Sequence, residues 1–266
     1  MKTIKEEKTK NDKEIQHFNP NKDMPKNFFC LVAGARRFGK THQIRQICFE
    51  IHKNKKIGVF DYVCLVSKTA KIQTDAFPFI PPKERYDDIN EGLEKIEELI
   101  DQQKKRKEKK QKLLRILVIL DDIISEKGMM YDKRLLRFPI LLRHFNISAF
   151  LLVQRIQKAI PKIFPENSDI IIFFKSISQN ERQYIMENYL TILNTNDRKY
   201  VFDYYDKIFT QPFVSMVILK LKAMDSIDLF GYVKKYLASK EQPFLKNFKM
   251  GRDYFWRKRN NTEIKH

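Results

Sequence analysis

The amino-acid sequence predicts an α/β fold with a mostly parallel central sheet flanked by helices, and three observations indicate it. Short continuous apolar runs, typical of strands that are buried on both faces, alternate with longer segments of helical periodicity. Several of these runs end in polar or glycine-containing segments. The chain has 266 residues and is 42% hydrophobic with 21 phenylalanines, which is enough for one large buried core.

Each strand is expected at one of the short apolar runs. The first, residues 28–33, reads FFCLVA and leads directly into a segment with two glycines. Because strands alternate with helical segments, most neighbouring strands should run parallel. Further strands are expected where Val, Ile, Leu and Phe dominate, at residues 62–67, 115–120, 147–153, 170–174 and 213–221.

Helices are expected where apolar residues recur every three or four positions. Residues 41–53 place Ile44, Ile47 and Ile51 on one face, as an amphipathic helix that covers a sheet would. A long charged helix is expected at residues 90–112. Further helices are expected at residues 135–144, 178–193 and 196–208.

The charge of the chain indicates a polyanionic partner. It carries 52 lysines and arginines against 33 acidic residues, a formal net charge of +19, and nucleic acid is the commonest polyanion that such a surface attracts. An alternative stays open, because coding bias toward Lys, Ile and Asn would produce the same excess. Most of the cations are lysines, which gives no indication of sequence-specific base readout.

The sequence favours neither a membrane protein nor a disulfide-bonded secreted protein. No apolar run approaches the ~18 residues that span a bilayer, and the first 26 residues are too polar for a secretory signal, so we expect a cytosolic protein. Cys30, Cys48 and Cys64 lie in apolar or amphipathic stretches without metal-ligand spacing. This indicates buried thiols in a reducing compartment, and we expect no metal site built from Cys and His.

The segment after the first strand fits the phosphate-loop pattern G-x-x-x-x-G-K-[ST]. Its glycines let successive backbone N–H groups turn toward phosphates, and a helix beginning near Lys40 adds the positive end of its dipole. Lys40 is expected to reach the β- and γ-phosphates of ATP, and the Thr41 hydroxyl to bind Mg²⁺. An ordinary strand–helix turn is the weaker interpretation, because the chain has only seven glycines. The loop comprises Gly34, Ala35, Arg36, Arg37, Phe38, Gly39, Lys40 and Thr41.

An acidic pair follows the strand expected at residues 115–120. Asp121 is expected to face Mg²⁺, through a water molecule, and Asp122 to act as the general base that deprotonates the attacking water. The alternative is that the pair only caps the next segment.

Gln154 ends the strand expected at residues 147–153. It would lie beside the two acids if this strand intervenes between the phosphate loop and the acidic strand. Its amide could then sense the γ-phosphate or hold the attacking water. The alternative is a polar residue without a catalytic role, because polar residues are common at the carboxyl ends of strands.

Together these segments resemble the genome-packaging ATPases of poxvirus-like large DNA viruses and of virophages, within the FtsK–HerA superfamily. The resemblance rests on the phosphate loop, on ILDD at residues 119–122 and above all on RHFNISAFLLVQ at residues 143–154. Pro161 and Asn167 continue it, so that it spans about residues 27–221.

The resemblance implies a RecA-like P-loop ATPase of the additional-strand class that assembles as a homo-oligomeric ring. It implies a motor that pumps double-stranded DNA into a preformed capsid in the cytoplasm of the infected cell. Capsid proteins are a further candidate partner, and the virion is a further candidate location. It also implies an arginine donated across the subunit interface. The family often has Arg shortly before Asn167, whereas residues 164–166 read FPE here. The identity of the donated arginine is therefore open: Arg143 is the first candidate and Arg155 the second, and either could be a surface residue.

The flanking segments differ from the central one in composition. We expect a flexible N-terminal arm at residues 1–26, the ATPase domain at 27–221, and a basic, aromatic-containing extension at 222–266. Two basic runs are candidates for contacts with DNA phosphates, and solvated charge on helix faces is the alternative for each. They are residues 104–112 and the tail cations Lys246, Lys249, Arg252, Arg257, Lys258 and Arg259.

Three other functions also fit parts of the sequence. A P-loop kinase of a small acceptor would use the same phosphate loop, although the acidic pair and Gln154 favour water as the acceptor. A non-packaging DNA translocase or helicase-like ATPase would share the whole site. A non-catalytic scaffold with a degenerate site is disfavoured by the intact Lys40, Thr41 and Asp121.

Overall fold

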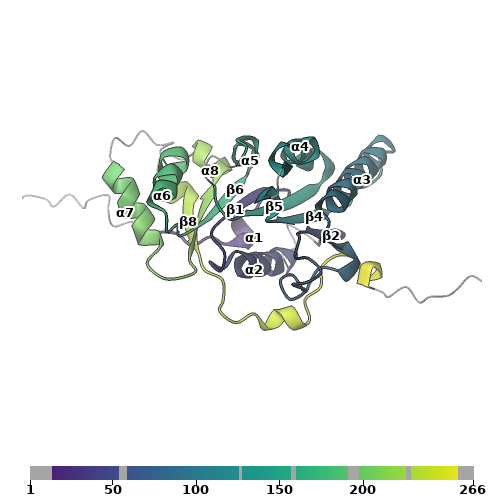
Figure 1. Cartoon of the computed structure of the whole chain (residues 1–266), viewed down its shortest axis with the longest axis horizontal. Coiled ribbons are helices and arrows are strands. Elements are labelled where there is room, and N and C mark those ends of the chain that lie inside the picture. Colours follow the sequence, from purple (N-terminus) through teal and green to yellow (C-terminus); the bar gives the residue numbers. More distant parts are fainter. Residues whose placement is uncertain are drawn as a thin grey trace, which may run out of the picture.

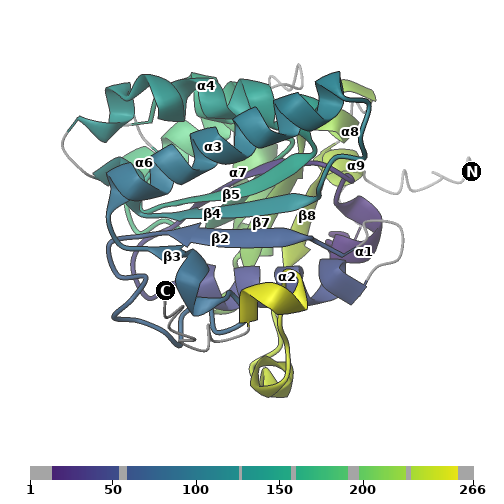
Figure 2. The same cartoon turned by 90° about the vertical axis from the view of Figure 1, so that its right-hand side faces the viewer.

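A central sheet with helices on both faces organises the protein (Figures 1 and 2). The structure, a computed structural model, describes residues 14–53, 59–125, 128–156, 160–190, 198–225 and 229–256. Within these residues eight strands lie in the order β3-β2-β4-β5-β1-β6-β7-β8. Their bounds are β1 (Phe29–Ala33), β2 (Tyr62–Val66), β3 (Arg85–Tyr86), β4 (Ile116–Asp121), β5 (Ile147–Val153), β6 (Ile170–Phe174), β7 (Ser215–Leu219) and β8 (Val233–Tyr236).

The helices form two layers. Helices α3 and α4 cover one face of the sheet, and α2 lies against the other (Figure 2). The described helices are α1 (Pro20–Asp23), α2 (Lys40–Lys53), α3 (Ile89–Glu108), α4 (Lys133–Leu141), α5 (Ile163–Asn167), α6 (Gln179–Ile185), α7 (Arg198–Ile208), α8 (Lys220–Asp225) and α9 (Leu229–Tyr232). None of the described helices is long and apolar enough to cross a membrane.

The predicted fold class is confirmed. Strands β1 to β6 pair in parallel, and only β7 pairs antiparallel with its neighbours on either side among the described strands. β5 lies between β1 and β4, with Leu31 opposite Leu151 and Asp121 opposite Leu152. An additional strand therefore separates the phosphate loop from the acidic pair. This is the strand order that would place Gln154 beside the two acids.

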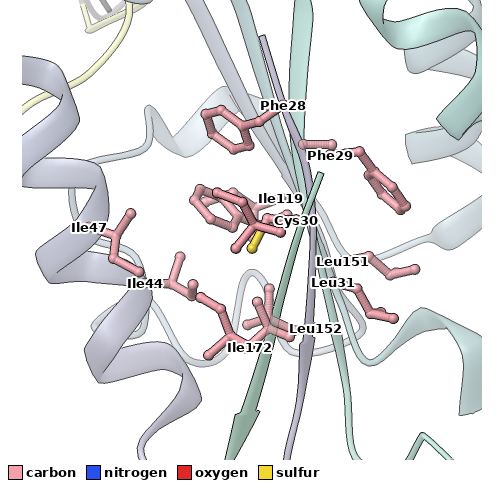
Figure 3. Close-up of a cluster of buried hydrophobic side chains, with 14 of the residues drawn as sticks. Phe28, Phe29, Cys30, Leu31, Ile44, Ile47, Ile119, Leu151, Leu152 and Ile172 are labelled. Atoms are coloured by element: carbon pink, nitrogen blue, oxygen red, sulfur yellow. The ribbon is translucent and has the colours of Figure 1, made fainter. Parts of the chain in front are cut away.

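The continuous apolar runs are explained by burial on both faces. Figure 3 shows Phe28 and Cys30 on the side of α2, where Ile44 and Ile47 meet them, and Phe29 on the opposite side. All five residues of β1 are buried. Because alternate side chains of a strand point to opposite faces, a strand between two helical layers must be apolar at every position. The three cysteines are buried free thiols in this core.

Element bounds differ from expectation mainly where helices end. The helix expected at residues 178–193 divides into α6 and a π-helical turn at Met186–Leu190. The one expected at 135–144 begins at Lys133 and passes into a tight 3₁₀ turn, which ends where Asn146 adopts a left-handed φ of 57°. Strand β3, with two residues, is too short to give a periodicity signal.

The sheet extends beyond the domain boundaries expected from composition. The strand β8 follows residue 221, and Phe18 N–H donates to the Lys235 carbonyl at 2.9 Å, so the N-terminal segment lies beside it. The Asp23 side chain is 3% exposed and accepts from the Lys234 ammonium group at 2.9 Å. After β8 the chain runs along α2, where Phe244 stacks on Phe49 at 3.9 Å between ring centroids. Residues 14–26 and 233–250 are thus packed on the sheet and α2, and residues 1–13 lie outside the described part.

A buried carboxylate joins the amino ends of β1 and β6. Asp169, 3% exposed at its side chain, accepts from Phe29 N–H at 2.8 Å and from the Arg143 guanidinium at 2.6 Å. Burial raises the pKa of Asp169, while both donors oppose that rise. A carboxylate held by two donors at this depth is a structural element, and Arg143 is its ion-pair partner within the chain.

We expect Asp169→Ala to lower the free energy of unfolding by about 2 kcal/mol, because Phe29 N–H would lose its acceptor and Arg143 its partner. Denaturant unfolding measures the change. The control is Asp206→Ala, which removes the more exposed pair with Arg182, worth about 0–1 kcal/mol. Equal effects of the two substitutions would contradict the structural role of Asp169.

Candidate nucleotide-binding and hydrolysis site

The predicted phosphate loop lies between the carboxyl end of β1 and the first turn of α2. Its two glycines are required for different reasons. A Cβ atom on Gly34 would lie 2.7 Å from Cβ of Phe174, whereas Gly39 adopts a left-handed φ of 96°. The Gly34 N–H donates to the Val153 carbonyl at 3.1 Å, which ties the loop to β5. The backbone therefore curls tightly before α2 begins, as a phosphate cradle requires.

Lys40 folds back over this loop. Its Nζ donates to the carbonyls of Gly34 at 2.5 Å and Ala35 at 3.1 Å. Burial lowers the pKa of Lys40, while Asp121 and Asp122 raise it. An ammonium group beside two carboxylates in a partly desolvated site is placed to meet phosphate oxygens.

The two acids diverge in environment although they are adjacent in sequence. Asp121 ends β4, and burial raises its pKa to about 6, with Lys40 opposing that rise and Asp122 adding to it. Asp122 adopts a left-handed φ of 58°, and its N–H donates to the Leu152 carbonyl at 3.0 Å. The left-handed backbone at Asp122 turns the chain sharply directly after Asp121.

Gln154 meets the second acid, as its predicted position required. Its Nε2 donates to Oδ2 of Asp122, and Nη2 of Arg36 lies 3.8 Å from the same oxygen. The Arg36 side chain is 80% exposed, so this longer contact is a weak one. The hydrogen bond from Gln154 therefore fixes the orientation of the Asp122 carboxylate.

These groups line one cavity of about 660 Å³, here called the phosphate cavity. It brings together Lys40, Thr41, Asp121, Asp122 and Gln154. Part of its wall was not expected from the sequence, namely Ser67, Lys68, Thr69 and Gln73, which follow β2. A signal for them exists, because three polar residues directly after a buried strand lie at the same edge of a parallel sheet as the phosphate loop.

The donor set at this cavity is sparse in carboxylates. Among the described residues no cluster of three or more His, Cys, Asp or Glu side chains could hold a metal by itself. The oxygen donors that line the cavity include the Thr41 hydroxyl and the Asp121 carboxylate, the two groups expected to face Mg²⁺. This set fits Mg²⁺, which typically takes one or two protein oxygens and completes its shell with phosphate oxygens and water.

The two arginine candidates lie in different surroundings. Arg143 is at the amino edge of the sheet, bound to Asp169, whereas the phosphate cavity is at the carboxyl edge. Arg155 directly follows Gln154, and its side chain is exposed. Of the two candidates, only Arg155 lies next to the cavity. It is Arg143, and not Arg155, that pairs with the buried Asp169.

The two basic runs lie apart from the phosphate cavity. Gln103, near the end of α3, donates to the carbonyls of Leu114 and Phe145, which places residues 104–112 at the amino edge. In the tail, Arg252 donates to Asp61 at 3.0 Å. Arg257, Lys258 and Arg259 lie outside the described residues.

Comparison with known proteins identifies one matching family model and several similar solved structures. The family model described as Poxvirus A32 protein matches residues 16–212. No curated protein sequence matches the chain. The genome packaging NTPase B204 from Sulfolobus turreted icosahedral virus 2, in complex with AMPPCP, has a TM-score of 0.52 and 15% identity, over 81% of this chain and 100% of its own.

Two further solved structures are similar. The DNA-packaging ATPase B204 from Sulfolobus turreted icosahedral virus has a TM-score of 0.52 and 16% identity, over 81% of this chain and 98% of its own. EssC (ATPases 2 and 3) from Geobacillus thermodenitrificans has a TM-score of 0.54 and 14% identity, over 85% of this chain and 42% of its own. At such identities these structures establish the fold alone.

The family match covers most of the chain, including the phosphate loop, the acidic pair and Gln154. It confirms the resemblance stated from the motifs, and with it an ATPase. The chain therefore belongs to the poxvirus A32 protein family, the viral packaging ATPases of the FtsK–HerA type.

Proposed function

We propose that the protein is an ATP-driven motor that moves double-stranded DNA into a preformed capsid without reading its sequence. One observation carries the proposal: Lys40, Asp121, Asp122 and Gln154 meet in one cavity, in a chain of the packaging ATPase family. The structural similarity to the two B204 proteins, a genome packaging NTPase and a DNA-packaging ATPase, supports it. The place of action would be the cytoplasm of the infected cell.

In the proposed reaction residues 34–41 hold the triphosphate, and Lys40 neutralises charge on its β- and γ-phosphates. Thr41 and Asp121, the latter through water, would hold Mg²⁺, which supplies further neutralisation of phosphate oxygens when bound. Asp122 accepts a proton from water as the water oxygen bonds to the γ-phosphorus and the bond to ADP breaks. Gln154 keeps the Asp122 carboxylate in position for that proton.

The proposed ring would place each nucleotide beside a neighbouring subunit. Arg155 is then the better candidate for the donated arginine, because Arg143 is held by Asp169 within its own subunit. An arginine at the γ-phosphate would stabilise charge that develops in the transition state. Lysines at the end of α3, including Lys104 and Lys107, are exposed and fit contacts to DNA phosphates.

We expect Lys40→Ala to abolish ATP hydrolysis, because no other group would neutralise the β- and γ-phosphates at that position. Release of inorganic phosphate, with and without double-stranded DNA, measures the activity, and DNA should stimulate the wild type. Lys53→Ala, at the far end of the same helix, is the matched control and should retain activity. Turnover that needs a small acceptor and ignores DNA would overturn the motor in favour of a kinase.

Asp122→Asn should retain ATP binding and lose turnover by about 100-fold or more, because an amide cannot accept the proton of the attacking water. Equilibrium binding and single-turnover hydrolysis separate the two effects. The matched control is Asp87→Asn, which changes an acid that pairs with Lys71 on the surface. Hydrolysis at the wild-type rate by the Asp122→Asn protein would show that another group is the base.

DNA affinity should fall steeply with salt, since phosphate contacts release condensed counterions. We expect the double substitution Lys104→Gln and Lys107→Gln to lower the slope of log K against log[salt] by about 2, if both contact phosphates. The control is Lys133→Gln with Lys162→Gln, an equal charge change at other exposed lysines. Equal slopes for the two double variants would exclude the end of α3 as a DNA contact.

A further inference from the structure

Gln154 lines two cavities at the carboxyl edge of the sheet. The phosphate cavity holds it together with the acids. The second cavity has a volume of about 360 Å³, and its lining also includes Gly34, Arg155 and Glu181. Gln154 therefore lies where the catalytic acids meet a second set of groups, and Glu181 is the acid of that set.

The Glu181 carboxylate joins two segments that follow different strands. Its Oε1 accepts from the Ile156 N–H at 3.1 Å, and its Oε2 accepts from the Ser176 hydroxyl at 2.6 Å. Ile156 comes three residues after the end of β5, and Ser176 comes two residues after the end of β6. Because β1 lies between β5 and β6, this carboxylate links the two strands on either side of the one that leads into the phosphate loop.

Glu181 does not serve as an ordinary helix cap. Ser178, at the start of α6, accepts from the Glu181 N–H at 3.4 Å, which is half of a capping box. In a complete capping box the glutamate side chain would accept from the Ser178 N–H, but the Ser176 hydroxyl oxygen accepts from that N–H here, at 3.2 Å. The carboxylate instead holds Ile156 and Ser176, so its contacts connect two strand ends rather than complete the helix cap.

Gln154 lies between two fixed points of the backbone. On one side the Val153 carbonyl accepts from the Gly34 N–H at 3.1 Å, and on the other the Ile156 N–H is held by Glu181. Ile156 is 1% exposed, so burial also fixes its position. The two points are three residues apart in the chain. The Glu181 contact therefore limits how far Gln154 can move.

We infer that Glu181 is a positioning residue for ATP hydrolysis, which acts by holding the backbone that carries Gln154. The inference rests on the proposed roles of Asp122 and Gln154 in the reaction. The Gln154 amide donates to the Asp122 carboxylate, so a displacement of Gln154 would let that carboxylate turn away from the attacking water. Catalysis is sensitive to such displacements, since a misplacement of about 1 Å can lower a rate about 100-fold.

The contacts of Glu181 require reach and a hydrogen-bond acceptor rather than a charge, because both donors are neutral groups. Glutamine has the same reach: its amide oxygen can accept from the Ile156 N–H while its amide nitrogen donates to the Ser176 hydroxyl oxygen. Aspartate keeps the charge and suits the first turn of α6, but it is one methylene shorter. Leucine keeps most of the volume and lacks an acceptor. These three substitutions therefore separate positioning from charge and from helix stability.

The test measures the Kd of MgATP and the single-turnover rate of hydrolysis for each variant. We expect Glu181→Leu and Glu181→Asp to lower the rate about tenfold or more and to leave the Kd unchanged, because they displace Gln154 and not the phosphate loop. Glu181→Gln should retain the wild-type rate. The matched control is Glu187→Leu, which removes an exposed acid that accepts from Gln183 at 2.8 Å, four residues away.

A double substitution shows whether Glu181 acts through Gln154. Gln154→Ala should lower the rate by itself, and adding Glu181→Leu should cause little further loss, because the side chain that Glu181 positions is then absent. A residue that only supports the fold would instead lower the rate by the same factor in both backgrounds. Should Glu181→Leu fail to fold, Glu181→Asp carries the same comparison, since it keeps the charge at the start of α6.

Three results would overturn the inference. A wild-type rate in the Glu181→Asp and Glu181→Leu proteins would show that other contacts hold Gln154. Loss of rate in Glu181→Gln with a normal rate in Glu181→Asp would assign the effect to charge. An equal further loss in the Gln154→Ala background would assign it to the fold. Failure of the proposed function is a different result, because the unsubstituted protein would then not hydrolyse ATP, or Gln154→Ala would hydrolyse it at the wild-type rate.

Discussion

The insertion of β5 between β1 and β4 is the constraint on which the site depends. Parallel pairing brings the carboxyl ends of these three strands to one edge, and each end carries a different group: the phosphate loop, the acids and Gln154. Because β5 intervenes, Gln154 lies between the loop and the acids and reaches Asp122. A different strand order would leave the same residues in the sequence without a common cavity.

Burial of opposite charges gives this edge its chemistry. Burial lowers the pKa of Lys40 and raises the pKa of Asp121, and the charge of each group opposes the pKa shift of the other. Groups in such a balance respond strongly to a further charge, because the partly desolvated site screens charge less than water does. Binding of phosphates or of a divalent cation would therefore change the pKa values of both groups. Asp122 lines the same cavity, and the hydrogen bond from Gln154 orients its carboxylate.

The C-terminal segment is part of the nucleotide-binding edge. β8 extends the sheet, and the residues after it reach the first turn of α2 through His42 and Gln43. Further along, Phe244 stacks on Phe49, so the segment follows the length of that helix. The C-terminal segment therefore contacts α2 at its first turn and again further along the helix.

The sequence alone determined the phosphate loop, the acidic pair, Gln154 and the principal strands, because each is encoded locally by glycine spacing, apolar runs and the residues that end them. The bounds of β5 and β6 agree with those expected. Composition could not reveal that β8 joins the sheet, since a four-residue strand with two lysines lacks an apolar run. Nor could it show that Arg143 binds Asp169 or that Gln43 holds Phe213. These contacts join residues 26 and 170 positions apart, and only the tertiary structure decides which distant groups share a buried space.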